Sequence, residues 1–216
     1  DEVLSIAERR FRLSEDNLIF ATSFTWLQDT RENIFDKSWT RFRWKLASAG
    51  TILSGVSALT QTEENENGNK EFGGVAYSQY IKGEAEVIKH WTLFDNNVFA
   101  TRAFVGLAIP YGNSNNIPFT RSYFAGGTND NRGWRAYSLG PGSSGGVLDF
   151  NEANFKLAFN GEYRYTILGA FKGAFFVDVG NIWNVLDDQA NNEAVTFNGI
   201  QDLKELAVAS GLGIRY

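Results

Sequence analysis

The stretch that decides the fold is Asn154-Phe-Lys-Leu-Ala-Phe-Asn-Gly-Glu-Tyr-Arg-Tyr-Thr-Ile-Leu168. Its even positions carry most of the polar and charged side chains, and its odd positions carry apolar and aromatic ones. In an extended strand this alternation places the two kinds of side chain on opposite faces. The stretch exceeds the strands of about 5–6 residues usual in globular proteins. It is long enough for a tilted strand that crosses a bilayer, which needs about 9–11 residues.

The same alternation recurs along the chain and predicts eight strands. They lie at about residues 3–12, 17–28, 38–50, 75–89, 98–110, 154–168, 171–183 and 204–216. Open sheet edges are not tolerated in hydrocarbon, so such strands must close into a barrel with an apolar lipid face and a polar lumen. The sequence therefore predicts an all-β, antiparallel transmembrane barrel. A large soluble β-sandwich or a lipocalin-like barrel is the alternative fold that alternation also permits.

The connections between the predicted strands are of two kinds. Residues 51–74, 111–153 and 184–203 form long, polar loops, whereas residues 29–37, 90–97 and 168–170 form short ones. Outer-membrane barrels have short turns on the periplasmic side and long loops outside. Eight strands could close a small barrel, but the loop 111–153 is large for one. We therefore expect residues 1–216 to be part of one larger barrel domain.

Composition excludes several classes of protein. The 216 residues include no Cys, which rules out disulfides and thiolate metal sites. No apolar run reaches the ~18 residues of a transmembrane helix, and a net charge of −5 argues against nucleic-acid binding. No secretory signal opens the chain at Asp1, so we expect an internal or mature fragment. We predict no cofactor and no metal site.

Two motifs are more specific than the alternation. The loop 111–153 contains Phe124 and the pair Gly126-Gly127, followed by Asn131-Arg132-Gly133-Trp134. A later strand reads Phe175-Phe-Val-Asp-Val-Gly-Asn181. The alternation alone assigns Glu162, Phe176 and Asp178 to the polar, lumenal face.

In order and spacing, these motifs resemble those of the BamA/TamA superfamily, also called the bacterial surface antigen domain. Its barrel carries a lid loop with a (Val/Ile)-Arg-Gly-(Phe/Tyr) motif after Phe-x-Gly-Gly, and a strand with Phe-x-Asp-x-Gly. Here Asn131 replaces the aliphatic residue and Trp134 replaces Phe or Tyr. The resemblance implies that Arg132 docks on the lumenal acids Asp178 and Glu162, with Phe176 beside it. The glycines Gly126, Gly127 and Gly133 would let the loop turn sharply.

The resemblance also implies an architecture and a function. The family fold is a sixteen-stranded barrel preceded by periplasmic POTRA domains, so this chain would lack those domains, the early strands and the last two strands. The implied function is non-enzymatic insertion or translocation of proteins at the outer membrane of a Gram-negative-type bacterium. The implied partners are outer-membrane lipids, nascent β-barrel or exported proteins, and periplasmic or lipoprotein accessory subunits.

Three alternative functions remain open at this point. The first is a two-partner secretion pore, and the second is a diffusive porin or transporter with a constriction lined by Arg41, Arg43 and Lys45. The third is a barrel-tethered hydrolase that uses Ser144 of a Gly-x-Ser-x-Gly sequence with His90, which we predict in a short turn. The acidic segment around Glu63 and Glu64 lacks the spacing of a calcium loop and predicts a solvated loop.

Overall fold

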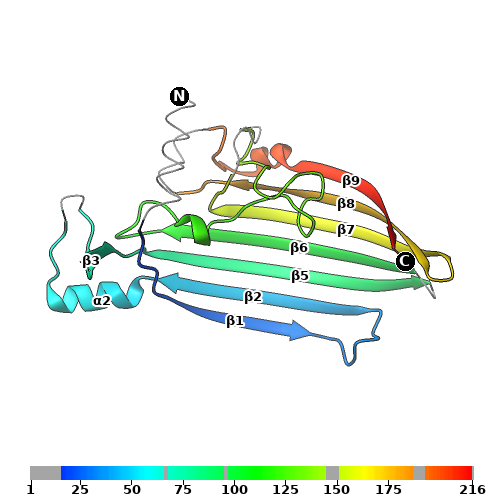
Figure 1. Cartoon of the computed structure of the whole chain (residues 1–216), viewed down its shortest axis with the longest axis horizontal. Helices are drawn as coiled ribbons and strands as arrows, with labels where there is room; N and C mark the ends of the chain where they lie inside the picture. Colours follow the sequence, from blue (N-terminus) through cyan, green and yellow to red (C-terminus); the bar gives the residue numbers. More distant parts are fainter. Residues whose placement is uncertain (1–15, 66–67, 95–96, 145–150, 187–192, 216) are drawn as a thin grey trace.

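The computed structural model describes residues 16–65, 68–94, 97–144, 151–186 and 193–215 (Figure 1). Seven strands form one antiparallel sheet in the order β1-β2-β5-β6-β7-β8-β9. Their bounds are β1 Ala21–Asp29, β2 Trp39–Ala49, β5 Tyr80–Phe94, β6 Asn97–Pro110, β7 Phe155–Leu168, β8 Phe171–Trp183 and β9 Ala207–Arg215. Each strand pairs with its predecessor and its successor in the sheet, as in an up-and-down barrel wall.

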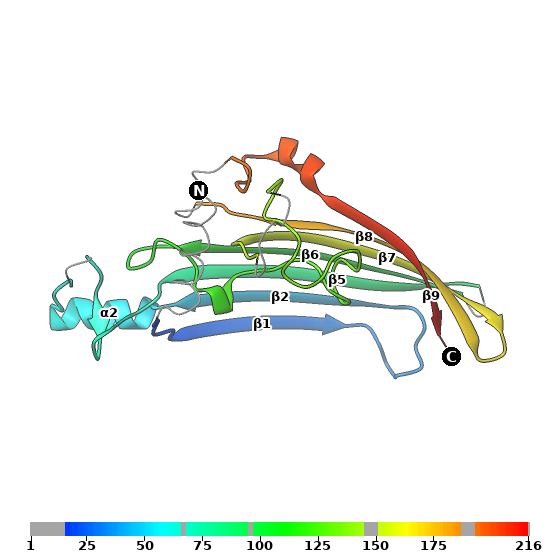
Figure 2. The same cartoon turned by 45° about the horizontal axis from the view of Figure 1, so that its top comes forward.

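The sheet is curved (Figure 2). Its two faces carry unlike side chains. One face, called the outer face here, exposes large apolar side chains along its length. They include Phe24, Trp26, Trp44, Leu46, Ile81, Val87, Val105, Phe159, Phe175, Val208 and Leu212. A soluble domain rarely exposes so large an apolar surface. The outer face therefore has the character of a wall that meets lipid.

The opposite, inner face carries the charged side chains of these seven strands, with the exception of Lys89 in β5. The loop between β6 and β7, residues 111–153, is called the lid loop, and its described residues 111–144 and 151–153 lie over this face (Figures 1 and 2). The main apolar core forms where the lid loop packs on the loop end of the inner face. Its members are Ala49, Tyr80, Ala108, Ile117, Tyr123, Ala125, Leu139, Ala153 and Ile182.

The fold class predicted from the alternation is confirmed, and four strands, β2, β6, β7 and β8, have the predicted bounds to within one residue. Strand β8 has the predicted bounds, and the bounds of β1 and β9 differ by a few residues. The strand predicted at 3–12 lies outside the described residues. No helix in the part of the chain that the structure describes combines the length and apolarity required to cross a membrane.

Three local predictions were wrong. The segment 51–74 is not simply a loop, because it holds helix α2 (Thr51–Thr60) and strand β3 (Glu71–Phe72), which pairs with β4 (Val75–Ala76). The strand predicted from residue 75 starts only at Tyr80, because the Asn113 side chain binds the Tyr77 carbonyl. His90 lies inside β5 rather than in a short turn, since β5 continues to Phe94.

The C-terminal strand prediction also began too early. A short 3-10 helix, η3 (Ile200–Glu205), precedes β9. Asn181 donates to the Glu205 carbonyl at 2.7 Å, and the Trp183 indole donates to its carboxylate at 2.9 Å. These two bonds from β8 hold Glu205 in the turn. A second short 3-10 helix, η1 (Phe119–Arg121), lies within the lid loop.

Candidate functional site

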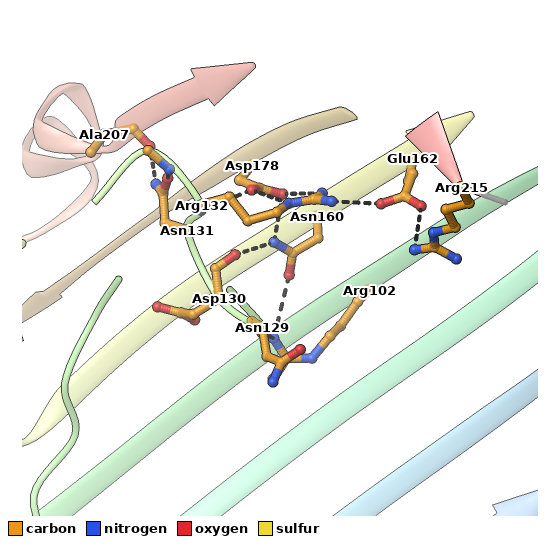
Figure 3. Close-up of polar contacts among 11 residues, drawn as sticks. Arg102, Asn129, Asp130, Asn131, Arg132, Asn160, Glu162, Asp178, Ala207 and Arg215 are labelled. Carbon is orange, nitrogen blue, oxygen red and sulfur yellow. Dashed lines mark hydrogen bonds and ion pairs between the residues drawn. The ribbon is translucent and has the colours of Figure 1, made fainter. Parts of the chain in front are cut away.

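The candidate site lies where the tip of the lid loop reaches the inner face of β7 and β8 (Figure 3). Arg132 donates from Nε and Nη2 to the two carboxylate oxygens of Asp178, each at 2.8 Å. Its Nη1 donates to Glu162 Oε2 at 2.6 Å, and its backbone N–H donates to Asp178 at 3.0 Å. One guanidinium is therefore held by two carboxylates, one of them in the bidentate geometry that gives strong, directional pairing.

The register of β7 and β8 creates the acceptor side of this site. Asn160 lies opposite Asp178, and Glu162 lies opposite Phe176, so all four side chains share the inner face. Asn160 donates to Asp178 at 2.8 Å, which gives that carboxylate a further donor. We call Arg132, Asn160, Glu162, Phe176 and Asp178 the Arg132 cluster.

Both carboxylates of the Arg132 cluster are buried, so each needs a charged partner. Asp178 is 0% exposed and Glu162 is 8% exposed. A buried carboxylate is costly unless it is paired and hydrogen-bonded. Hydrogen bonding to Asp178, together with that to Glu162, raises the pKa of Arg132 above its ordinary value despite the opposing effect of burial. Arg132 is thus a permanent cation at the point where the wall presents buried acids.

Aromatic packing completes the cluster. The Arg132 guanidinium carbon lies 3.6 Å from the centroid of the Phe176 ring, within the range of a cation–π contact. Gly211 of β9 leaves room for this ring, because a Cβ there would lie 2.6 Å from Phe176 Cζ. The three neighbouring strands β7, β8 and β9 therefore all shape the position of Arg132.

Glycines set the path of the loop tip. Gly126 and Gly127 have φ of +94° and +103°, in the left-handed region that favours glycine. A Cβ at Gly126 would clash with the carbonyl oxygen of Arg135, and one at Gly133 would lie 2.7 Å from Ala209 Cβ. Trp134, the next motif residue, is partly buried against the apolar core.

Asn131, the residue that departs from the family motif, has its own role in the structure. It is 2% exposed, and its Nδ2 donates to the carbonyl of Ala207, the first residue of β9, at 3.1 Å (Figure 3). The side chain thus makes a polar contact that an aliphatic residue could not make. From the sequence, Asn131 was only a departure from the family motif, and its contact with β9 was not predicted.

Other fastenings of the lid loop were also missed. Lys156 of β7 pairs with Asp130 at 2.8 Å and donates to the Phe124 carbonyl at 2.7 Å. Arg102 of β6 donates to the Asn129 carbonyl at 3.3 Å. Alternation placed Lys156 and Arg102 on the inner face, but no signal in the sequence indicates which loop atoms they reach.

The residues of the alternative functions do not converge. Ser144 Oγ donates to the Pro141 carbonyl at 2.7 Å at the loop end, whereas His90 stacks on Trp39 at the far end of β2. Arg43 pairs with Glu84 and Glu86. Among the described residues, no group of His, Cys, Asp and Glu side chains could hold a metal ion.

Taken together, the long alternating strands, the apolar outer face and the inward-folded lid loop define a class, the membrane-embedded β-barrel with a loop docked in its lumen. Comparison with known protein families matches residues 4–216 to the Omp85 superfamily domain. The chain therefore belongs to the Omp85 superfamily, and the predicted family resemblance is confirmed.

A solved structure is also similar to this chain. It is the crystal structure of BamA from Haemophilus ducreyi lacking POTRA domains 1-3, with 13% sequence identity and a TM-score of 0.48. The match covers 92% of this chain and 50% of that chain, so this chain spans about half the length of that BamA chain.

Family membership also fixes the location of the chain. It is part of a β-barrel of the Gram-negative outer membrane, as the sequence predicted. The short turns between β1 and β2, β5 and β6, and β7 and β8 all lie at one end of the sheet, and the lid loop leaves from the other. We assign the turn end to the periplasm, as is general in such barrels.

Proposed function

We propose that this chain is part of the barrel of a factor that inserts or translocates proteins at the outer membrane. Membership of the Omp85 superfamily supports this class of function. The observation that carries the proposal is the docking of Arg132 on Asp178 and Glu162, because it fixes a long loop inside the lumen. The chain is one part of a single barrel domain, with POTRA domains and two further strands outside it.

The physical basis is strand pairing rather than chemistry. An unpaired strand edge presents N–H and C=O groups that an incoming strand can bind. A barrel that opens such an edge loses part of its own cohesion, and a loop fastened across its inner wall compensates for that loss. No catalytic group, cofactor or metal is required. The partners are nascent β-barrel or exported proteins, the surrounding outer-membrane lipids, and periplasmic or lipoprotein accessory subunits.

The inner wall also bears on the porin alternative. The proposed constriction residues Arg41 and Arg43 are engaged in ion pairs, Arg41 with Asp29 at 2.9 Å and Arg43 with Glu84 at 3.2 Å. The lid loop covers part of the inner face (Figure 2). Both features favour a fastened loop over an open diffusion path.

The test is a substrate-insertion assay with the full-length protein reconstituted in liposomes. Arg132→Ala and Asp178→Ala should each lower the rate at which a substrate barrel becomes folded, by about tenfold or more. The double variant should be no worse than the poorer single variant, because the two residues act as a pair. Arg135→Ala is the matched control, since Arg135 is an exposed arginine of the same loop. Wild-type insertion rates in both single variants would refute the proposal.

A further inference from the structure

Most cations in the middle of the inner face have a carboxylate partner, whereas the cations at its turn end outnumber the carboxylates near them. In the middle, each of several cations has a carboxylate within 4 Å. The pairs are Arg43–Glu84, Lys82–Glu84, Arg102–Glu86, Lys156–Asp130 and Arg132–Asp178. Ion pairing there links wall to wall and wall to loop. A cation outside this pattern therefore needs a separate explanation.

At the turn end, Arg164 of β7, Lys172 of β8 and Arg215 of β9 gather on the inner face, and we call them the turn-end cations. Lys172 lies directly opposite Arg215 in the β8–β9 register. Like charges directly opposite on one face of a sheet are destabilising. Lys172 makes no ion pair with any described residue.

One carboxylate serves this group, and it is already engaged. Glu162 Oε1 accepts from Arg164 at 2.7 Å. The same oxygen lies 3.5 Å from Arg215, while Glu162 Oε2 accepts from Arg132 (Figure 3). A single negative charge is therefore shared by three guanidinium groups. The local charge stays positive after every described pair is counted.

The turn-end cations surround a cavity. Its volume is about 220 Å³, and Arg164, Lys172, Arg215 and His90 line it together with Lys37 of the β1–β2 turn. An adjoining cavity of about 250 Å³ shares His90, Arg164 and Arg215 and extends to Arg102 and Arg132. Its arginines therefore outnumber the two carboxylates that line it, Glu162 and Asp130. A positively charged hollow thus leads from the turn end to the Arg132 cluster.

We propose that this hollow binds an acidic polypeptide segment that approaches from the periplasmic side, with its carboxylates on the turn-end cations. The hollow opens on the inner face, whereas lipid meets the outer face, so a lipid headgroup does not have direct access. Guanidinium groups bind carboxylates in a directional, bidentate way. A segment with several acidic side chains would relieve the repulsion between Lys172 and Arg215. Glu162 could then pair with Arg132 alone.

Binding can be measured with the full-length protein in detergent micelles and a fluorescent hexaglutamate peptide as the probe. Lys172→Gln combined with Arg215→Gln should weaken binding by about tenfold or more, and wild-type binding should fall steeply with salt. Lys172→Arg should retain binding, because it keeps the charge. The matched control is Lys204→Gln combined with Arg135→Gln, which removes two exposed cations at other positions.

Several results would overturn the proposal. One is an equal affinity for the peptide in the Lys172→Gln/Arg215→Gln variant and in its control. Another is displacement of the peptide by inorganic phosphate at the same charge concentration. A third is stronger binding of phosphatidylglycerol vesicles than of the peptide. The inference rests on the proposed function for its biological use. The binding assay contains no insertion step. Loss of peptide binding therefore contradicts only this inference, whereas normal insertion in Arg132→Ala contradicts the proposed function.

Discussion

At the scale of single residues, Arg132 and Asp178 form a pair, and removing either one alone costs substantial stability. Asp178 is fully buried and keeps only the Asn160 amide as a side-chain donor if Arg132 is truncated. Breaking a buried pair by removing one partner costs about 3–5 kcal/mol. Arg132→Ala therefore releases the lid loop by leaving an uncompensated charge in the wall. The lid loop, rather than a strand, is therefore the first part to detach from the wall.

Asn131 offers a sharper residue-scale prediction, because its contact is specific to this chain. Asn131→Leu keeps the branching at Cγ but loses the hydrogen bond to the Ala207 carbonyl, worth about 1 kcal/mol. Hydrogen exchange at the first β9 amides, Ala207 to Ala209, should then accelerate by about fivefold. Asn131→Asp should accelerate it more, since a carboxylate oxygen would face the carbonyl.

The control for this experiment is Asn129→Leu. Asn129 is exposed, and its contact with Arg102 uses the backbone carbonyl, which the substitution keeps. Unchanged exchange at β9 in Asn131→Leu and Asn131→Asp would show that the lid loop does not hold this strand.

Single residues could be placed on a face of the sheet from the sequence where a periodic rule applied. Alternation alone put Glu162, Phe176 and Asp178 on the inner face, and the loop motif indicated that Arg132 approaches them. The structure brings these four side chains together, while their functional role stays a prediction. Asn131, Asp130 and Asn129 could not be placed, because contacts of an irregular loop depend on its path and not on a repeat.

At the scale of elements, the strands were predictable and the loop-end elements were not. Polar and apolar residues must alternate along the whole length of a membrane strand, so β7 and β8 could be predicted from the sequence. Helix α2 lacks the usual signals: Gly50 is its N-cap without a side-chain cap bond, and the first turn has no acidic residue. Such a helix is stabilised by the structure around it rather than by capping.

The packing of the lid loop on β6 gives an element-scale prediction. The Tyr123 ring lies against Gly106, where a Cβ would be 2.5 Å from Tyr123 Cζ. Gly106→Ala should displace the loop and destabilise its docked state by about 1–3 kcal/mol, the usual cost of overpacking. Limited proteolysis of the lid loop should become faster.

The matched control is Gly83→Ala on the neighbouring strand β5. A Cβ there meets nothing within 4 Å, so the loop should be cleaved at the wild-type rate. Equal cleavage of the Gly106 and Gly83 variants would mean that Tyr123 does not fasten the lid loop to the wall. Burial also raises the pKa of Tyr123, so the packed ring stays neutral at ordinary pH.

At the scale of the whole molecule, one curved sheet separates two environments. On the central strands the outer face carries one charged side chain, Lys89 near the turn end of β5, while the inner face holds ion pairs and the docked loop. Such a division is useful only if lipid lies on one side and water on the other. The same substitution should therefore have very different costs on the two faces.

Val105→Lys tests this division. Val105 is exposed on the outer face of β6, and a lysine at the bilayer midplane costs about 2–4 kcal/mol. Ser23→Lys is the control, because Ser23 lies opposite Ala47 on the inner face and is exposed there. Urea unfolding of the full-length protein in lipid vesicles should show a large loss of stability for Val105→Lys and a change within about 0.5 kcal/mol for Ser23→Lys. In detergent micelles, where water reaches the wall more easily, the difference should shrink. Equal losses for the two lysines in vesicles would contradict the assignment of the outer face to lipid, because a lysine that faces a wet lumen does not have to enter hydrocarbon.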